Sequence, residues 1–129
     1  MKKNNKGFTL AELLIVVAII AVLVAIAIPV FTNQLEKSRE ATDLANIRSG
    51  YAAAMTQYLD DGTQDIDVPV TAQQTIAGWI TDNHTLSAAI GGTGSGAYSQ
   101  EITVPDFVVG KTWHVKIKAA DGSVEVTCE

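Results

Sequence analysis

KGFTLAELLIVVAIIAVLVAIAIPVF, residues 6–31, is the stretch that sets the architecture of this 129-residue chain. From Leu13 to Ile28 it has no polar side chain, yet Glu12 stands directly before the run. The sixteen residues 13–28 would span about 24 Å as a helix, which is short of a hydrocarbon core of about 30 Å. The wider segment, residues 8–31, would span about 36 Å. The stretch therefore predicts a membrane-spanning helix from Phe8 to Phe31, with Pro29 near its end.

The residues that flank this apolar run predict its orientation. Three lysines precede Gly7, namely Lys2, Lys3 and Lys6. No basic residue lies within the apolar run itself. By the positive-inside rule this flank predicts a cytoplasmic N-terminus, with the rest of the chain across the membrane. Two ordinary interpretations remain open on these grounds. Ala-Ile-Ala at residues 25–27 offers the cleavage site of a secretory signal peptide, and the run also suits a plain membrane anchor.

KGFTLAE, residues 6–12, followed by the apolar run, resembles the leader junction of type IV prepilins and the related pseudopilins. The pattern of that family is a short basic leader ending in glycine, then phenylalanine, Thr-Leu, one further residue and glutamate. By this resemblance Gly7 ends the leader, Phe8 begins the mature protein and Glu12 is its fifth residue. The resemblance covers about residues 1–35 and is specific in this setting. The rest of the chain carries no motif of one subfamily.

The resemblance implies a route of processing and assembly. A prepilin peptidase would cut between Gly7 and Phe8 at the cytoplasmic membrane face and methylate the new amine of Phe8. The apolar helix would be kept as an anchor and then become the packing core of a helical filament, built with a membrane assembly platform and other pilins. Glu12 would meet the Phe8 amine of a neighbouring subunit, and Pro29 would kink or locally unwind the helix. The alternative for Glu12 is a helix cap, where a negative side chain contributes about 0.3–1 kcal/mol.

Residues 32–59 predict an amphipathic continuation of the same helix. Apolar side chains recur at three- and four-residue spacings, and the predicted buried stripe is Leu35, Leu44, Ala45, Tyr51, Ala52, Met55, Tyr58 and Leu59. The predicted polar side holds Lys37, Arg39, Glu40 and Asp43. Glu36 can pair with Arg39 three residues later. The Asp-Asp-Gly sequence at residues 60–62 predicts the end of the helix.

Residues 60–129 predict a small α+β body. Residues 66–70, IDVPV, predict a short edge strand, because a proline cannot donate to a central ladder. Residues 71–82 predict a short helix with Thr71 as its N-cap and with Ile76, Trp79 and Ile80 on one face. Strand-like runs follow at residues 101–109, 112–118 and 123–128, and an Asp-Gly turn at residues 121–122 is expected to join the last two.

These elements define the expected fold class. A long N-terminal helix, first transmembrane and then amphipathic, packs against a small antiparallel sheet whose apolar face covers the helix, as in type IV pilins. The expected segments are a leader at residues 1–7, an apolar helix at 8–31, its amphipathic continuation at 32–59 and a globular body at 60–129.

Composition excludes several classes of function. The net charge is −5 and becomes −8 without residues 1–7, which leaves six basic against fourteen acidic residues and disfavours non-specific binding of nucleic acid. The one cysteine, Cys128, cannot form a disulfide within these residues. No nucleophile–base pair or metal constellation stands out, so neither an enzyme nor a cofactor is expected.

Four features of the body are potential chemical sites. The acidic residues Asp60, Asp61, Asp65 and Asp67 are candidate calcium ligands, although their spacing fits no EF-hand and a solvated turn is the stronger interpretation. GGTGSG, residues 91–96, lacks the lysine of a phosphate-binding loop. His114 is expected on the polar face of its strand. Cys128 is expected on an apolar face, as a small buried hydrophobe.

The leading hypothesis is a structural subunit of a type IV pilus or related filament, serving adhesion, motility, DNA uptake or secretion. The precursor would be a single-pass protein of the cytoplasmic membrane, and the filament would lie at the cell surface. One alternative is a minor or secretion-type pseudopilin. Another is a membrane-anchored or secreted binding domain that does not polymerise.

Overall fold

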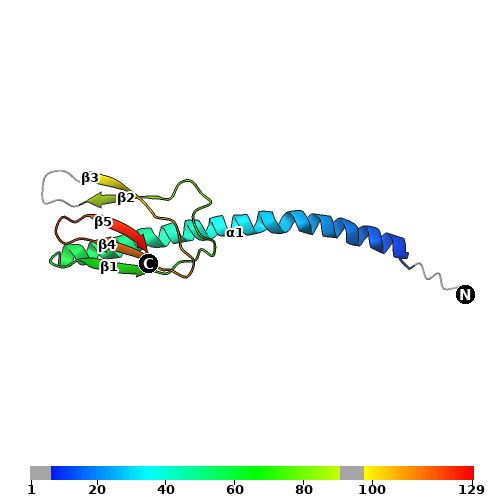
Figure 1. The fold of residues 1–129 in the computed structure, drawn as a ribbon, viewed down its shortest axis with the longest axis horizontal. Coiled ribbons are helices and arrows are strands. Elements are labelled where there is room, and N and C mark those ends of the chain that lie inside the picture. Colours follow the sequence, from blue (N-terminus) through cyan, green and yellow to red (C-terminus); the bar gives the residue numbers. More distant parts are fainter. Residues whose placement is uncertain (1–6, 91–97) are drawn as a thin grey trace, which may run out of the picture. The chain divides into compact units, whose positions relative to one another are not determined.

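The computed structural model describes residues 7–90 and 98–129, and the chain divides into two compact units, one ending at Leu35 and the other running from Glu36 to Glu129. One long helix, α1 (Leu10–Asp60), includes the whole apolar run and the segment after it (Figure 1). The predicted long helix is therefore confirmed, with ends one or two residues from the expected ones. We call the unit from Glu36 to Glu129 the body.

The described residues of the body form five strands in two antiparallel sheets, which are labelled in Figure 1. Their bounds are β1 (Ile66–Val70), β2 (Thr85–Ile90), β3 (Tyr98–Thr103), β4 (Trp113–Ile117) and β5 (Val124–Cys128). One sheet has the order β1-β4-β5, and the other is the β2-β3 pair. The predicted edge strand is confirmed as β1. The predicted last hairpin is confirmed too, with Gly122 at a φ of 69° in its turn, where only glycine is unstrained.

Two predictions for the body are wrong. Residues 71–82 form no helix, because several of their N–H groups donate to carboxylates of α1 instead of to their own carbonyls. The predicted strand 101–109 ends at Thr103, two residues before Pro105. That strand, β3, pairs with the unpredicted strand β2 rather than joining the sheet of β4 and β5.

The core lies where α1 packs on the inner face of the β1-β4-β5 sheet. Its buried sheet residues include Trp113, Val115 and Ile117 from β4, together with Val124 and Val126 from β5. Alternation along β4 places these apolar side chains inside and His114 and Lys116 outside, as expected for a sheet with one solvated face. The prediction that the sheet covers the helix is confirmed.

The face that α1 buries differs from the predicted stripe. The buried residues of α1 are Glu36, Glu40, Asp43, Ile47, Gly50 and Ala54. Four members of the predicted stripe are exposed: Leu35, Ala45, Ala52 and Leu59. The other four, Leu44, Tyr51, Met55 and Tyr58, are half-buried and pack at the margin of the core. The predicted stripe was therefore centred beside the true contact line, and the assignment of Glu40 and Asp43 to the polar side was wrong.

Gly50 marks the closest approach of α1 to the sheet. A Cβ at this position would lie 2.6 Å from Cγ2 of Val70 and 3.5 Å from Cγ2 of Val115. The sequence suggested only a weak helix position there, because glycine lowers helix stability by about 1 kcal/mol relative to alanine. The structure adds a packing reason for the glycine.

Candidate functional site

The first turn of α1 is closed by a reciprocal pair of hydrogen bonds between Thr9 and Glu12. The backbone N–H of Thr9 donates to Oε2 of Glu12 at 2.8 Å, and the backbone N–H of Glu12 donates to Oγ1 of Thr9 at 3.2 Å. This is the capping-box arrangement, which satisfies two backbone donors that a helix start leaves without partners. In the single chain Glu12 therefore acts as a cap. A second role in contact with another subunit is a separate question.

The unit that ends at Leu35 has no buried residue among those described, Gly7 to Leu35. Phe8 is 93% exposed, and large aliphatic side chains from Leu10 to Val30 are exposed all around the helix. α1 is long and apolar enough to cross a membrane. A helix that is apolar on every side must be covered by lipid or by other helices. This surface is the main candidate for anchoring and assembly.

Pro29 lies within α1, and the helix continues across it without interruption. Proline removes one backbone donor, so the carbonyl four residues earlier lacks its usual helical partner. Oγ1 of Thr32 donates to the carbonyl of Pro29 at 3.0 Å. Val24, Ala27, Ile28 and Phe31 line a shallow apolar groove on the same stretch. The kink expected at Pro29 stays a prediction.

Three buried carboxylates on α1, which we call the acidic stripe, bind the irregular segment at residues 73–81. The stripe consists of Glu36, Glu40 and Asp43, each at most 1% exposed. Asp43 accepts from the backbone N–H groups of Gln73 and Gln74, at 2.6 and 3.1 Å. Its Oδ2 also accepts from Nε1 of Trp113 at 3.3 Å. Asp43 thus joins the helix, the segment and strand β4.

The two glutamates of the acidic stripe hold the rest of the segment. Glu36 accepts from the N–H groups of Thr75 and Ile76, at 2.7 and 2.9 Å, and Glu40 accepts from those of Ile80 and Thr81, at 2.5 and 3.1 Å. Six backbone donors therefore end on three carboxylates of one helix face. The segment takes its shape from α1 rather than from its own secondary structure.

The electrostatics of Glu36 combine two opposing effects. Burial raises the pKa of its carboxyl, but the N–H groups of Ile76 and Thr75, the Thr75 hydroxyl and Arg39 favour the charged form. The net result is a pKa below the ordinary value. Nη1 of Arg39 lies 3.1 Å from Oε2 of Glu36, so the predicted ion pair is confirmed, and it also donates to Oγ1 of Thr75 at 2.8 Å.

Sequence reasoning missed the acidic stripe because charged residues were assigned to solvent. A signal was nevertheless present. Glu36, Glu40 and Asp43 have the four- and three-residue spacing of a helix face, and Ile47, Gly50 and Ala54 continue that spacing. Acidic residues that share the helical spacing of the core residues are expected on the core-facing side of the helix.

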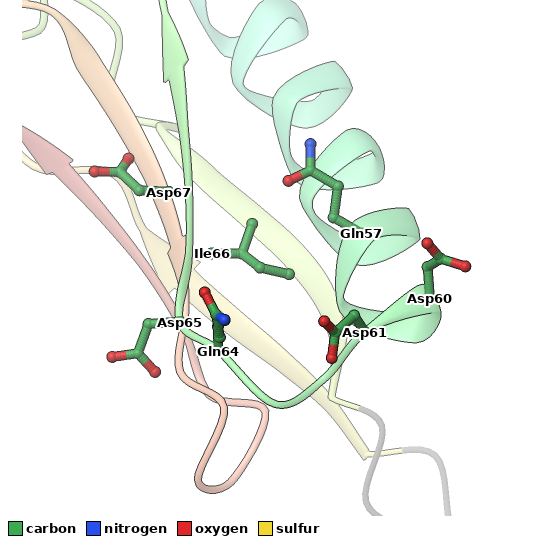
Figure 2. Close-up of a pocket in the computed structure, with 7 residues that line it drawn as sticks. All are labelled: Gln57, Asp60, Asp61, Gln64, Asp65, Ile66 and Asp67. Atoms are coloured by element: carbon green, nitrogen blue, oxygen red, sulfur yellow. The ribbon is translucent and has the colours of Figure 1, made fainter.

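The four candidate calcium ligands, Asp60, Asp61, Asp65 and Asp67, lie around the turn between α1 and β1 and do not converge on a metal site. Figure 2 shows Asp60 and Asp67 pointing away from each other on opposite sides of this turn. Asp61 accepts from the N–H and hydroxyl of Thr63, and Asp65 accepts from the N–H of Ala119. In the described part of the chain no group of three His, Cys, Asp or Glu residues could hold a metal ion.

The remaining candidates have structural partners or lie outside the described residues. Nδ1 of His114 lies 2.8 Å from Oδ1 of Asp67 on the outer face of the sheet, as expected for a polar-face histidine. His84 stacks on Trp79, with ring centroids 5.3 Å apart. Cys128 is half-buried against the core, and its Sγ lies 3.4 Å from the backbone N of Val108. The glycine-rich loop at residues 91–96 lies outside the described residues.

Comparisons with known proteins match the N-terminal segment and, separately, nearly the whole chain. The family model of the prokaryotic N-terminal methylation motif matches residues 2–28. The chain is 32% identical to the fimbrial protein EcpC of Eikenella corrodens over 133 residues, covering 99% of this chain and 84% of EcpC. It is 28% identical to the type IV major pilin protein PilE of Neisseria gonorrhoeae over 143 residues, covering 99% of this chain and 76% of PilE.

A third relative matches a shorter part. The type IV major fimbrial protein FimA of Dichelobacter nodosus is 41% identical over 92 residues, which cover 71% of this chain and 53% of FimA. No solved structure matches the chain significantly. These three relatives carry the names of structural pilins, not of enzymes. With the methylation motif, the exposed apolar helix and the helix-on-sheet body, the similarity to EcpC along nearly the whole chain shows that this chain belongs to the type IV pilin family.

Proposed function

We propose that this chain is a structural subunit of a type IV pilus or related filament and polymerises through the exposed apolar part of α1. The observation that carries this proposal is that no described residue up to Leu35 is buried. Once the helix has left the membrane, packing against the same helix of other subunits would keep these side chains away from water, which is worth about 25 cal/mol per Å² of apolar area. The filament would serve adhesion, motility, DNA uptake or secretion at the cell surface.

Processing at the Gly7–Phe8 bond fits the local structure. Gly7, Phe8 and Thr9 precede the helix, and a Cβ at Gly7 would have no atom within 4 Å. A prepilin peptidase would therefore meet a non-helical, uncovered bond. The lysines of the leader favour a cytoplasmic N-terminus, and the peptidase at that face would methylate the amine of Phe8. The subunit would then pass to the membrane assembly platform and to other pilins.

Glu12 would set the register of an incoming subunit by pairing with the Phe8 amine of a neighbour. Within a packed bundle of apolar helices a carboxylate without a partner is strongly unfavourable, and a single positive amine is a suitable partner. In the single chain this carboxylate binds the N–H and hydroxyl of Thr9. Assembly would exchange at least one of these local bonds for an intersubunit one.

Two substitutions separate the register role from the capping role. Glu12→Val removes both the charge and the cap, whereas Glu12→Gln keeps a capping-box side chain and removes only the charge. If Glu12 sets the register, both variants lose their leader, yet neither builds filaments. If it only caps the helix, Glu12→Gln builds filaments at near-normal yield.

The measurements are electron microscopy of sheared fibres, an immunoblot for processed subunit and the mass of the mature N-terminus. A wild-type N-terminus at Phe8, with or without a methyl group, supports the filament subunit. An N-terminus at Ile28 would indicate a secretory signal peptide, and an intact leader would indicate a plain anchor. Either of these results contradicts the proposal. Abundant filaments made only of Glu12→Val protein would exclude the register role.

A further inference from the structure

The side chain of Thr9 helps to fix where α1 starts. The helix begins at Leu10, and Thr9 stands before it as the N-cap residue. Its Oγ1 accepts from the backbone N–H of Glu12 at 3.2 Å and donates to Oε2 of Glu12 at 3.0 Å. Its carbonyl accepts the first hydrogen bond of the helix, from the N–H of Leu13 at 3.2 Å. The hydroxyl of Thr9 thus supports the first turn through two separate contacts.

Without the Thr9 hydroxyl, the N–H of Glu12 would need another acceptor. The acceptor that an α-helix provides is the carbonyl four residues earlier, which here belongs to Phe8. In and near the hydrocarbon core a backbone donor without a partner is strongly unfavourable, so extension of the helix toward the N-terminus would be favoured. One further step pairs the N–H of Ala11 with the carbonyl of Gly7, and the Gly7–Phe8 bond then lies within the helix.

A peptide bond within a helix is a poor substrate for a peptidase. Its flanking N–H and C=O groups are already used in hydrogen bonds, whereas proteolysis concentrates in exposed segments without secondary structure. In the observed structure Gly7, Phe8 and Thr9 belong to no helix or strand, and Phe8 is 93% exposed. The chain therefore presents the Gly7–Phe8 bond in a form that a peptidase can bind.

We propose that Thr9 is a positioning residue for leader removal, because its capping of α1 keeps the Gly7–Phe8 bond outside the helix. This inference rests on the proposed function, which supplies the cut at this bond. Thr9 follows Phe8 directly, so its hydroxyl acts on the substrate's conformation from one residue beyond the bond that is cut. The capping box then serves processing as well as the stability of the first turn.

The size of the effect follows from the fraction of chains that hold the bond outside the helix. Only these chains are substrates, so the apparent rate of cleavage falls as that fraction falls. Loss of a threonine N-cap shifts the balance at a helix start by about two- to thirtyfold. Gly7 opposes the extension, because glycine is a poor helix former. We therefore expect the rate to fall several-fold without reaching zero.

Cleavage of the full chain by a purified prepilin peptidase in detergent tests the role of Thr9. Initial rates of leader release are measured by mass spectrometry for the wild type and for Thr9→Val, which keeps the shape of the side chain and removes the hydroxyl. Thr9→Ser and Thr9→Asn are the matched controls, because serine and asparagine are good N-caps of different shape.

A double variant, Thr9→Val with Leu10→Pro, fixes the start of the helix by another route. Proline at the first helical position needs no partner for an N–H group, and it keeps the residue before it out of the helical conformation. The helix then starts at position 10 without any hydroxyl at position 9. Leu10→Pro alone should be cut at the wild-type rate and is the control for the double variant.

The expected result is a several-fold slower cleavage of Thr9→Val, with rates close to wild type for Thr9→Ser, Thr9→Asn and the double variant. Cleavage of Thr9→Val at the wild-type rate would overturn the role of Thr9 and leave the proposed function intact. A slow double variant, with Leu10→Pro alone cut normally, would mean that the peptidase contacts the hydroxyl directly, which also overturns the inference. Failure to cut the wild-type chain after Gly7 would contradict the proposed function, and the inference with it.

Discussion

The buried face of α1 in the body has two halves of opposite chemistry. Its first half is the acidic stripe, Glu36, Glu40 and Asp43, and its second half is the apolar set Ile47, Gly50 and Ala54. Both halves follow the same helical spacing and are almost fully buried. They differ in what lies opposite. The acidic half faces the irregular segment at residues 73–81, and the apolar half faces the β1-β4-β5 sheet.

The difference shows that the side chains that can pack against a backbone depend on whether its N–H and C=O groups already have hydrogen-bond partners. Within the sheet, ladder hydrogen bonds between β1, β4 and β5 already use backbone groups, so apolar side chains can cover it. The irregular segment has no strand partner for its N–H groups, and burying such donors unpaired is strongly unfavourable. Carboxylates that accept two donors each make burial of this segment feasible.

The largest expected effect comes from removing the centre of the acidic half. Asp43→Ala leaves Nε1 of Trp113 and two backbone N–H groups without their acceptor. Because each buried donor without a partner costs about 1–3 kcal/mol, we expect a loss of about 3–5 kcal/mol in the free energy of unfolding. Asp43→Asn, which keeps one acceptor oxygen, should lose less than half as much.

Both tryptophans, Trp79 and Trp113, lie in the body, so urea unfolding of the full chain in detergent can be followed by tryptophan fluorescence. The background for each measurement is the wild-type chain in the same detergent. If Asp43→Ala were no less stable than Asp43→Asn, the carboxylate would not be supporting the segment, and the contrast between the two halves would fail.

A smaller effect is expected in the apolar half. Gly50→Ala places a methyl group 2.6 Å from Cγ2 of Val70, so the helix or Val70 must shift. Overpacking of this kind costs about 1–3 kcal/mol, which outweighs the gain of about 1 kcal/mol in helix propensity at the upper end of that range. We expect a net loss of up to about 2 kcal/mol in the free energy of unfolding. The exposed neighbour serves as the control, since Ser49→Ala should be neutral or slightly stabilising. Equal stability of the two variants would mean that the contact at Gly50 relaxes freely.

The smallest expected effect is on the pH dependence of stability. It distinguishes the acidic half of the buried face of α1 from the apolar half, because only the acidic half can titrate. Glu36 has a folded-state pKa below its ordinary value, so its contribution is complete above the unfolded pKa and is lost as the pH falls through the folded pKa. Stability should therefore decrease below about pH 4.5, which is the ordinary pKa of a glutamate carboxyl. Asp61, Asp121 and Glu129 also have lowered pKa values and add to the same trend.

The contribution of Glu36 is isolated by comparing the chain with Glu36→Gln between pH 7 and pH 3. Thermal unfolding of Glu36→Gln should depend less steeply on pH than that of the wild type, because one titrating group with a shifted pKa is gone. Parallel pH profiles for the two proteins would show that the hydrogen bonds of Glu36 do not favour its charged form.

How far the sequence predicted the structure depended on whether a local pattern or a distant contact decided each element. The long helix, strand β1 and the β4-β5 hairpin follow from periodicity, Pro69 and the Asp-Gly turn, and all three are confirmed. The helix predicted at residues 71–82 is wrong because carboxylates some forty residues away take its N–H groups. Alternation in β2 is weak, since it contains Ser87, Ala88 and Ala89.

The candidate site divides in the same way. The motif around Gly7, Phe8 and Glu12 is contiguous, so a sequence resemblance could find it, and the match to the methylation motif together with the similarity to EcpC confirms the family. The contacts of the acidic stripe depend on the distant segment at residues 73–81, which folds against α1. No local pattern in residues 71–82, TAQQTIAGWITD, predicts those contacts.

Pro69 has a consequence for a protein built to polymerise. β1 is an edge strand, and an open edge invites a strand of another molecule to extend the sheet. Pro69 has no N–H to offer such a strand, and exposed Asp67 places a charge beside it. Strand-to-strand growth would compete with helix-driven growth for the same subunits and would be hard to reverse. The blocked edge of β1 thus works as a safeguard against amyloid-like association in a chain that must reach high local concentration before it is assembled.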